Sequence, residues 1–471
     1  MLALGVFVAA CAARIWLAAT RPLWHDEIFT LWLSRSAPRE IVSALHLDSG
    51  PALFYLLIRP FTLAAELWAL PDSAVRALPI LAIALLVFGA RSLPRGESRA
   101  WFVALISTSV LLTYYSAEAR AYALLALLDF ALFLLLRSAG RPRGAFVRAS
   151  LIALCAAAAL QTHYLALFFV AAAGLTALLE RRWRDAAALS AGGVPFLPWL
   201  PILLRQPSEA TAWMRDSLSR SVAGFLSSLG GVGRVPPAFG FPPAAPLFWL
   251  AAAGGAATLV LLLPTAKRDA EVRAGLLVSS AFLAAALAAS LLRPVAFAGR
   301  TELAILPVWI WTVARAVPSA RGLRAAAWAH AVLGAIALAT CVPTPRLEPS
   351  GPRVSAALAG LVRPTDLVVA GAAFYLPARL ARDRGGLAAP LQGFPREVER
   401  HPGWFPLRAP PEKAYRELEA ALSSRPAASR VWIAVHPLFA TRRMGEVLER
   451  RGALKEALRG PDVLVMVWTA P

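Results

Sequence analysis

The chain has 471 residues, of which 58% are hydrophobic, and it carries a formal net charge of +20. Soluble globular domains are about 45–50% apolar, so this composition excludes an ordinary soluble protein and predicts a polytopic membrane protein. Most of the positive charge is arginine in loops between apolar segments. Because such arginines are typical topology signals, we expect no nucleic-acid partner.

The apolar segments have roughly the length that crosses ~30 Å of hydrocarbon. They cover residues 1–20, 51–70, 73–90, 100–114, 120–137, 148–162, 164–180, 185–205, 246–264, 273–292, 302–317 and 324–342. The first segment lacks the basic start and the cleavage site of a signal peptide, so we expect it to remain as the first span. The sequence therefore predicts a polytopic α-helical membrane domain with about 11–12 apolar segments.

Arginine-rich turns alternate with turns of other composition. These clusters are Arg91, Arg95 and Arg99; Arg137, Arg141, Arg143 and Arg148; Arg181, Arg182 and Arg184; Lys267, Arg268 and Arg273; and Arg315, Arg321 and Arg324. The positive-inside rule assigns them to the cytoplasm. Residues 51–90 hold two apolar segments but must make one net crossing, so we expect one of the two to be re-entrant, interfacial or joined to its neighbour. About eleven net crossings follow, with the N-terminus inside and the C-terminus outside.

The composition changes after Cys341, where "VPTPRLEPSGPR" has the character of a Pro-rich linker. Three apolar stretches, "DLVVAG", "RVWIAV" and "DVLVMVWTA", predict strands, and "EKAYRELEAALSS" and "RRMGEVLERRG" predict amphipathic helices. Strands alternating with helices favour an α/β fold. We expect a membrane domain over residues 1–342 and a small outer α/β domain over residues 343–471.

Polar side chains gather in the turns predicted to face outward. These turns carry His25, Asp26, Glu27, Asp48, Tyr114, Tyr115, Glu118, Arg120, His163, Tyr164, Arg293 and Arg300. The inward turns carry mainly arginine. An active site on the outer face, open to a lipid-linked substrate from the bilayer, is the simplest interpretation.

The motif "WHDE" contains the adjacent carboxylates Asp26 and Glu27 just after the first apolar segment. Such a pair could act as a general base or as oxygen ligands of a divalent metal. An alternative is that both acids begin a helix, "IFTLWLSRS", and stabilise its positive N-terminal end. The motif alone leaves both interpretations open.

Two further outward turns carry candidate residues. In "YYSAEARAY", Arg120 could bind a phosphate bidentately beside Glu118, or the tyrosines could form an interfacial aromatic belt with arginine as an anchor. In "QTHY", His163 and Tyr164 interrupt an apolar run, where a lone histidine is more often structural. Both turns remain open at this point.

Arg293 and Arg300 flank a third outward turn, against the cytoplasmic bias of arginine in membrane proteins. That placement favours binding of an anion, and phosphate is the obvious candidate.

Several of these segments together resemble the GT-C class of membrane glycosyltransferases. The resemblance is to bacterial relatives of the dolichyl-phosphate-mannose–protein mannosyltransferases and of the aminoarabinose–lipid A transferases. The segments that carry it are "LWHDEIFTLWLSR", "DSGPALFYLLIRPF", "YYSAEARAYALL", "QTHYLALFF" and "FAGRTELAILP", in this order over about residues 1–320. Thr301 stands where the family commonly has tyrosine, and Pro51 lacks the usual preceding histidine.

The resemblance implies an inverting glycosyltransferase that moves a hexose or pentose from a polyprenyl-phosphate donor to a glycan, lipid or protein acceptor. It implies Asp26 as the base with Glu27 assisting, and Arg120, Arg300 and secondarily Arg293 on the donor phosphate. Residues expected to line the sugar or acceptor are His25, Tyr115, Glu118, Tyr122, His163 and Tyr164. No cofactor besides the donor is firmly implied, and a divalent metal at Asp26 stays open. The expected location is the inner (plasma) membrane, with the site and the C-terminal domain in the periplasm.

Two other interpretations remain. A lipid or glycan transporter or flippase without transfer chemistry would place polar residues along the spans, whereas here they gather at one face. A catalytically degenerate envelope scaffold is kept open by Thr301 and the missing histidine.

Overall fold

The structure is a computed structural model that describes residues 2–46, 48, 50–138, 144–205, 214, 216–234, 245–341, 350–401, 410–426, 429–436, 442–459 and 463–470. Arg141, Arg143 and residues 342–349 of the expected linker lie outside the described residues. The chain divides into two compact units, one of residues 1–21 and 34–345, the other of residues 22–33 and 346–471.

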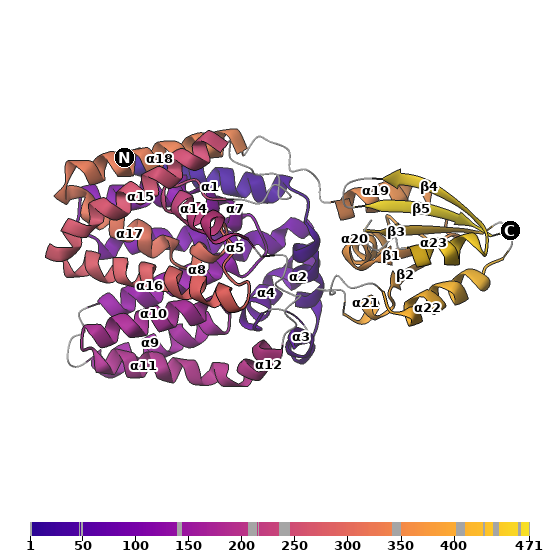
Figure 1. Ribbon diagram of the computed structural model, residues 1–471, viewed down its shortest axis with the longest axis horizontal. Helices are drawn as coiled ribbons and strands as arrows, with labels where there is room; N and C mark the ends of the chain where they lie inside the picture. Colours follow the sequence, from indigo (N-terminus) through magenta and orange to yellow (C-terminus); the bar gives the residue numbers. More distant parts are fainter. Residues whose placement is uncertain are drawn as a thin grey trace. The chain divides into compact units, whose positions relative to one another are not determined.

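The first unit is a bundle of helices (Figure 1). Its elements are α1 (Leu2–Thr20), α3 (Pro38–Leu45), α4 (Leu53–Leu67), η1 (Asp72–Arg76), α5 (Ala77–Leu85), η2 (Leu86–Ser92), α6 (Glu97–Thr108), α7 (Val110–Ser116), α8 (Tyr122–Arg137), α9 (Ala145–Leu160), α10 (Ala166–Leu179), α11 (Trp183–Gly193), η4 (Val194–Trp199), α12 (Leu200–Arg205), α14 (Leu218–Leu229), α15 (Ala245–Arg268), α16 (Ala270–Leu292), η6 (Thr301–Ala304), α17 (Leu306–Ala316), η7 (Val317–Ser319) and α18 (Arg321–Cys341). The helix α2 (His25–Arg35) crosses the boundary between the units.

Five helices in the described ranges are long and apolar enough to cross a membrane, or up to six if the bent pair Leu4–Thr20 and His25–Arg35 counts as one span. The five are Asp72–Ser92, Trp183–Arg205, Ala245–Arg268, Ala270–Leu292 and Arg321–Thr340. Shorter apolar helices cover Ala145–Leu160 and Ala166–Leu179. Large apolar side chains are exposed on this unit, including Phe146 at 84% and Leu292 at 94%, as expected of a surface that faces lipid. The chain is a multi-pass membrane protein.

Some apolar segments predicted from the sequence form helices that are shorter than a full membrane span, because the backbone breaks or bends within them. Ser109 has an extended backbone and caps α7, so residues 97–116 form two helices rather than one. Within residues 51–90, where two apolar segments were expected to make one net crossing, α4 has only 15 residues and contains Pro60. The next segment, Asp72–Ser92, is a full candidate span of 21 residues. Residues 51–90 therefore contain one helix of spanning length, and the number of net crossings stays a prediction.

Ion pairs join the five arginine-rich turns at one end of the bundle. The pairs are Arg324–Glu97 at 2.7 Å, Arg315–Asp269 at 3.0 Å, Arg137–Glu271 at 2.8 Å and Arg137–Glu180 at 2.5 Å. Glu180 directly precedes Arg181, so the third arginine cluster is included. The assignment of this end to the cytoplasm stays a prediction from the positive-inside rule.

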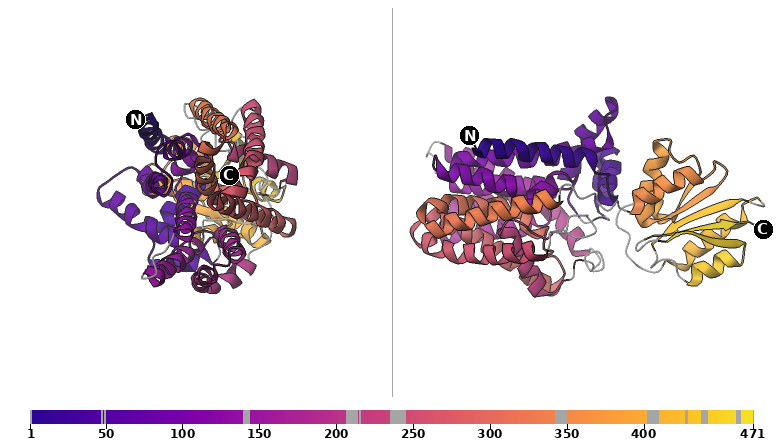
Figure 2. Two further views of the ribbon diagram at one scale, coloured as in Figure 1. Left: turned by 90° about the vertical axis from the view of Figure 1, so that its left-hand side faces the viewer. Right: turned by 90° about the horizontal axis from the view of Figure 1, so that it is seen from above.

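The second unit contains a five-stranded sheet with helices on both faces (Figure 2). Its strands are β1 (Leu367–Gly371), β2 (Leu391–Phe394), β3 (Arg430–Val435), β4 (Ala453–Arg459) and β5 (Leu464–Thr469), in the order β2-β1-β3-β5-β4. Its helices are α19 (Ser350–Leu361), α20 (Ala372–Asp383), α21 (Glu397–Arg400), α22 (Glu412–Ser423) and α23 (Arg442–Glu449). β1 pairs in parallel with β2 and β3, while β5 is antiparallel to β3 and β4.

Side-chain alternation along the strands divides the core of this unit in two. Val369 and Ile433 face one cluster, which includes side chains of α22 and α23. Val368 and Trp432 face the other, with side chains of α19 and α20. The predicted α/β fold is confirmed as a three-layer domain. The expected linker was too long at its C-terminal end, because Ser350 already begins α19, whose Val354 and Leu358 are buried against the sheet.

Candidate active site

Hydrogen bonds from its own backbone N–H groups to two hydroxyl side chains stabilise the loop after α16. The Ser290 hydroxyl accepts from the N–H groups of Val295 at 3.2 Å and Ala296 at 2.7 Å. The Thr301 hydroxyl accepts from the Phe297 N–H at 2.9 Å. Thr301 thus stabilises the turn.

Glu302 stabilises the same loop, and the sequence analysis assigned it no role. Its side chain is fully buried, and Oε1 accepts from the Gly299 N–H at 2.7 Å and from the Ser228 hydroxyl of α14. Gly299 has φ +95°, and an added Cβ would lie 1.8 Å from the Arg234 carbonyl oxygen. Only glycine fits this position without displacing the Arg234 carbonyl. The available sequence signal was an acid directly before an apolar run.

Arg300 lies against aromatic rings and is 7% exposed. Its Cζ atom is 5.7 Å from the ring centroid of Tyr122 and 5.7 Å from that of Phe297. A guanidinium over an aromatic face at this distance is attracted by the ring quadrupole.

Tyr122 is the centre of a cluster of rings from three segments. Its centroid lies 5.0 Å from that of Tyr115 and 5.0 Å from that of His163, and Tyr115 lies 5.0 Å from Tyr114. The Tyr115 hydroxyl is buried and makes no hydrogen bond within the described residues. A buried hydroxyl of this kind is available to a polar ligand.

The motif "YYSAEARAY" forms the tight connection between α7 and α8. The Tyr114 hydroxyl donates to Glu118 Oε1 at 3.4 Å, and the Arg120 N–H donates to the Glu118 carbonyl at 2.8 Å. Glu118 is 2% exposed. The connection turns Tyr115 and Tyr122 toward each other, so the sequence-predicted residues of this motif do come together.

His163 occupies the turn between α9 and α10, outside the membrane-spanning segments. The Leu165 N–H donates to its Nδ1 at 3.1 Å, so in the neutral ring Nε2 carries the proton. Burial and then the positive charges of Arg120 and Arg300 lower the pKa of His163 to about 3. The imidazole is therefore neutral at physiological pH, and both arginines are near enough to influence its titration.

Tyr164 and Arg293 make contacts with other elements. The Tyr164 ring lies 6.0 Å from that of Phe196 in η4. An Arg293 N–H lies 3.5 Å from the Leu203 carbonyl of α12. Tyr164 thus joins the α9–α10 turn to η4, and Arg293 joins the end of α16 to α12.

The acidic pair begins α2, within the second unit. Trp24 occupies the N-cap position: its carbonyl accepts from the N–H groups of Glu27 and Ile28 at 2.9 Å each, and its own N–H donates to Glu27 Oε2 at 3.3 Å. This is the backbone half of a capping box, with Glu27 at N3. Glu27 therefore performs the helix-capping role that the sequence left open.

Asp26 follows at the second helical position and is 7% exposed, while His25 is partly exposed at the first. The Asp26 carbonyl accepts from the Thr30 hydroxyl at 3.0 Å. In the same unit, the Phe29 ring lies 5.8 Å from that of His401, which joins α2 to the C-terminal residues.

The described residues contain no group of three or more His, Cys, Asp and Glu side chains that could hold a metal ion. At the acidic pair, one oxygen of Glu27 is already used by the Trp24 N–H.

No protein-family model matches the chain, and no curated protein is significantly similar to it. Among solved structures, ArnT from Cupriavidus metallidurans matches with a TM-score of 0.59 in the apo state and 0.57 bound to undecaprenyl phosphate. Both are 13% identical to this chain and cover 98% of it and 97% of their own length. The arabinofuranosyltransferase AftD from Mycobacteria matches with a TM-score of 0.48 at 15% identity, over 99% of this chain and 40% of its own. The resemblance to GT-C membrane glycosyltransferases is confirmed at the level of the fold.

Proposed function

We propose that the protein is an inverting glycosyltransferase that uses a polyprenyl-phosphate-linked hexose or pentose as its donor. The observation that carries the proposal is the buried Arg300, fixed over Tyr122 beside a neutral His163. Arg300, Tyr122 and His163 lie at the end of the bundle away from the ion-paired arginine turns. The fold of ArnT, whose solved structure holds undecaprenyl phosphate, supports the same donor chemistry.

Arg300 and Arg120 are proposed to bind the donor phosphate, with Arg293 as a further cation at the same end. Guanidinium groups bind phosphate oxygens through charge-assisted, often bidentate hydrogen bonds. As the sugar leaves, negative charge grows on the phosphate oxygen, and fixed cations there stabilise the transition state. The His163 Nε2–H, the Tyr115 hydroxyl, Tyr122 and Glu118 are proposed to line the sugar, together with Tyr164 and His25.

Asp26 is proposed as the general base. Its carboxylate takes the proton of the acceptor hydroxyl or amine while the acceptor atom bonds to the anomeric carbon. The bond from that carbon to the phosphate oxygen breaks, and its electron pair leaves with the polyprenyl phosphate. Attack opposite the leaving group inverts the anomeric centre. Glu27 assists by holding the first turn of α2.

We propose that the chain lies in the inner (plasma) membrane with a cytoplasmic N-terminus. The reaction and the C-terminal α/β domain are then periplasmic, and the acceptor is a glycan, lipid or protein of that compartment. The proposal rests on the positive-inside rule.

The test is to supply purified full-length protein with a panel of polyprenyl-phosphate sugars and candidate acceptors, and to identify the product by mass spectrometry. Asp26→Asn should lower transfer by about 10²–10⁴-fold, the usual contribution of a general base. Glu27→Gln is the matched control, because glutamine also completes a capping box and keeps the helix start. Full transfer by Asp26→Asn would contradict the assignment. Movement of donor across vesicles without any glycosylated product would favour a transporter instead.

A further inference from the structure

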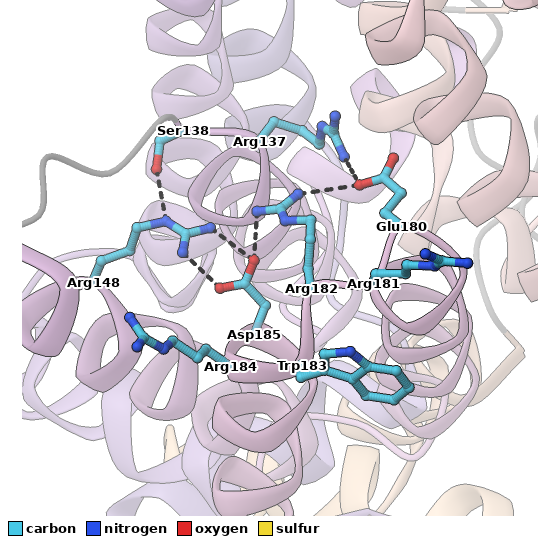
Figure 3. Close-up of a pocket in the computed structure, with 9 residues that line it drawn as sticks. All are labelled: Arg137, Ser138, Arg148, Glu180, Arg181, Arg182, Trp183, Arg184 and Asp185. Atoms are coloured by element: carbon cyan, nitrogen blue, oxygen red, sulfur yellow. Dashed lines mark hydrogen bonds and ion pairs between the residues drawn. The ribbon is translucent and has the colours of Figure 1, made fainter.

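The arginine-rich end of the bundle contains an open pocket of about 690 Å³. It is lined by Arg137, Ser138, Arg148, Glu180, Arg181, Arg182, Trp183, Arg184 and Asp185, which come from α8, α9, the α10–α11 turn and α11 (Figure 3). Since α8 runs from Tyr122 to Arg137, this pocket lies roughly 22 Å along the helix axis from the Tyr122 cluster. It is a separate site.

Three of the five arginines form a fixed framework around two carboxylates. Arg148 contacts Asp185 bidentately at 2.6 and 3.0 Å, Arg182 contacts the same carboxylate at 2.5 Å, and Arg137 contacts Glu180 at 2.5 Å (Figure 3). Arg148 and Arg182 also donate to the Leu136 carbonyl near the C-terminal end of α8. Arg137 also pairs with Glu271 at 2.8 Å, so three carboxylates compensate these three charges.

Arg181 and Arg184 are different: both are exposed, and neither forms an ion pair with another residue that the structure describes. No dashed line reaches either side chain in Figure 3. The lining residues thus leave positive charge for a ligand, and that ligand must be an anion.

Arg181 is also held in a conformation that costs energy. The Arg181 N–H donates to the Leu178 carbonyl and the Arg182 N–H donates to the Ala177 carbonyl, the two bonds of a Schellman motif that ends α10. Arg181 takes the position usually occupied by glycine, with φ +58°. A non-glycine residue there costs on the order of 1–2 kcal/mol. The chain carries a guanidinium at a position where glycine would be more stable, which favours a role for the side chain itself.

Apolar side chains beside the pocket indicate what kind of anion it accepts. Trp183 is 65% exposed and begins the candidate span Trp183–Arg205. Leu175, Leu178 and Leu179 are exposed on the last turns of α10, directly before Arg181. Tryptophan at the start of a span marks the membrane interface, and a basic pocket between helices at that level suits an anionic headgroup.

We propose that this pocket binds the phosphate of an anionic phospholipid, with Arg181 and Arg184 contacting the headgroup and the acyl chains lying along the exposed leucines of α10. The framework of Arg137, Arg148 and Arg182 holds the pocket open without taking part in charge recognition. The proposal is independent of the transfer reaction.

Native mass spectrometry of the full-length protein tests it, with phosphatidylglycerol, cardiolipin and zwitterionic phosphatidylcholine as probes. Each arginine near an anionic surface contributes about 1 kcal/mol, or about five-fold in affinity, so Arg181→Gly with Arg184→Ala should weaken retention of the anionic lipids about thirty-fold. Phosphatidylcholine retention should not change. Arg321→Ala is the matched control, because it removes one exposed arginine from another basic turn.

Thermal unfolding separates lipid binding from damage to the fold. Because glycine adopts φ +58° without strain, Arg181→Gly should unfold no earlier than the wild type while its lipid retention falls. Equal retention by the wild type and the double variant, or an equal loss in Arg321→Ala, would overturn the proposal. If millimolar inorganic phosphate displaced the lipid and bound equally well with the same dependence on Arg181, the site would be one for free phosphate instead.

Discussion

The guanidinium of Arg300 and the ring of Tyr122 are 5.7 Å apart, although the two residues are far apart in the sequence. Tyr122 also contacts Tyr115 and His163. One ring thus connects the arginine to the two turns that carry the remaining candidate residues.

Replacing Tyr122 should separate the effect of its ring from that of its hydroxyl. A cation–π contact contributes about 0.5–2 kcal/mol, so Tyr122→Leu should lower kcat/KM by up to about thirty-fold. Tyr122→Phe keeps the ring and should remain within a few-fold of the wild type. Arg300→Lys should lose more than either, since a lysine cannot form bidentate bonds to phosphate. Steady-state kinetics with the identified donor measures all three, and equal losses for leucine and phenylalanine would argue against the ring contact.

The backbone before Arg300 should tolerate no side chain at Gly299. With φ +95° and the Arg234 carbonyl oxygen 1.8 Å from the position a Cβ would take, Gly299→Ala must displace the loop. We expect a loss of stability of about 1–3 kcal/mol and a larger loss of transfer, measured by thermal unfolding and by product formation. Gly254→Ala is the control, because a Cβ at Gly254 in α15 meets nothing within 4 Å. A Gly299→Ala variant as stable and active as Gly254→Ala would contradict the loop geometry.

His163 should make the protein less stable in mild acid. Its folded pKa of about 3 lies below the ordinary value of 6.5, so the unfolded chain binds the proton more readily between these values. Stability should therefore fall as the pH drops below about 6.5, by less than about 1.4 kcal/mol for each pH unit because the side chain keeps some solvent contact. His163→Asn should weaken this dependence in unfolding scans between about pH 7 and pH 4. Parallel curves for the two proteins would show that His163 does not titrate in this way.

Asp366 should stabilise the C-terminal domain only while it is ionised. Burial by itself raises the pKa of Asp366, but hydrogen bonds from Arg430, the Arg363 N–H and Trp432 together outweigh it and lower the pKa. Because the folded pKa is below the unfolded value of about 3.9, this stabilisation is fully present above that value and is lost as the pH falls through the folded pKa.

Asp366→Asn should accordingly cost about 1.5–3 kcal/mol at neutral pH, with a difference from the wild type that shrinks as the pH falls through the lowered pKa. Thermal unfolding of the full-length protein, followed by circular dichroism, measures the effect. Asp383→Asn is a suitable comparison, since Asp383 is 44% exposed and lies 3.9 Å from Arg379, so its loss should cost at most about 1 kcal/mol. A difference that stayed constant with pH would exclude the charge as its cause.

The sequence predicted most accurately what depends on local pattern. The strands over Leu367–Gly371 and Arg430–Val435 are short apolar runs, and the helices over Glu412–Ser423 and Arg442–Glu449 have a clear amphipathic period. β4 was missed because "ALKEALR" carries charges, as edge strands often do. β2 has only four residues, too few to show a period.

The candidate site could be predicted where a turn contains its own partners. Tyr114, Glu118 and Arg120 interact within one motif, so their proximity followed from spacing. The bond between Ser228 and Glu302 joins residues 74 positions apart, and no local pattern indicates it. For Glu27 the local sequence was ambiguous, because an acid at this position fits both a helix cap and a catalytic pair. Only the contact from the Trp24 N–H in the structure identified the cap.

The ion pairs among the arginine-rich turns tie helices of the membrane unit together at one end. Arg137 and Arg315 each join two helices through partly buried charges that are costly to separate, and Arg324 adds an exposed pair with Glu97. Helices joined in this way cannot slide past one another without leaving a charge unpaired, so these turns fix the register of neighbouring helices.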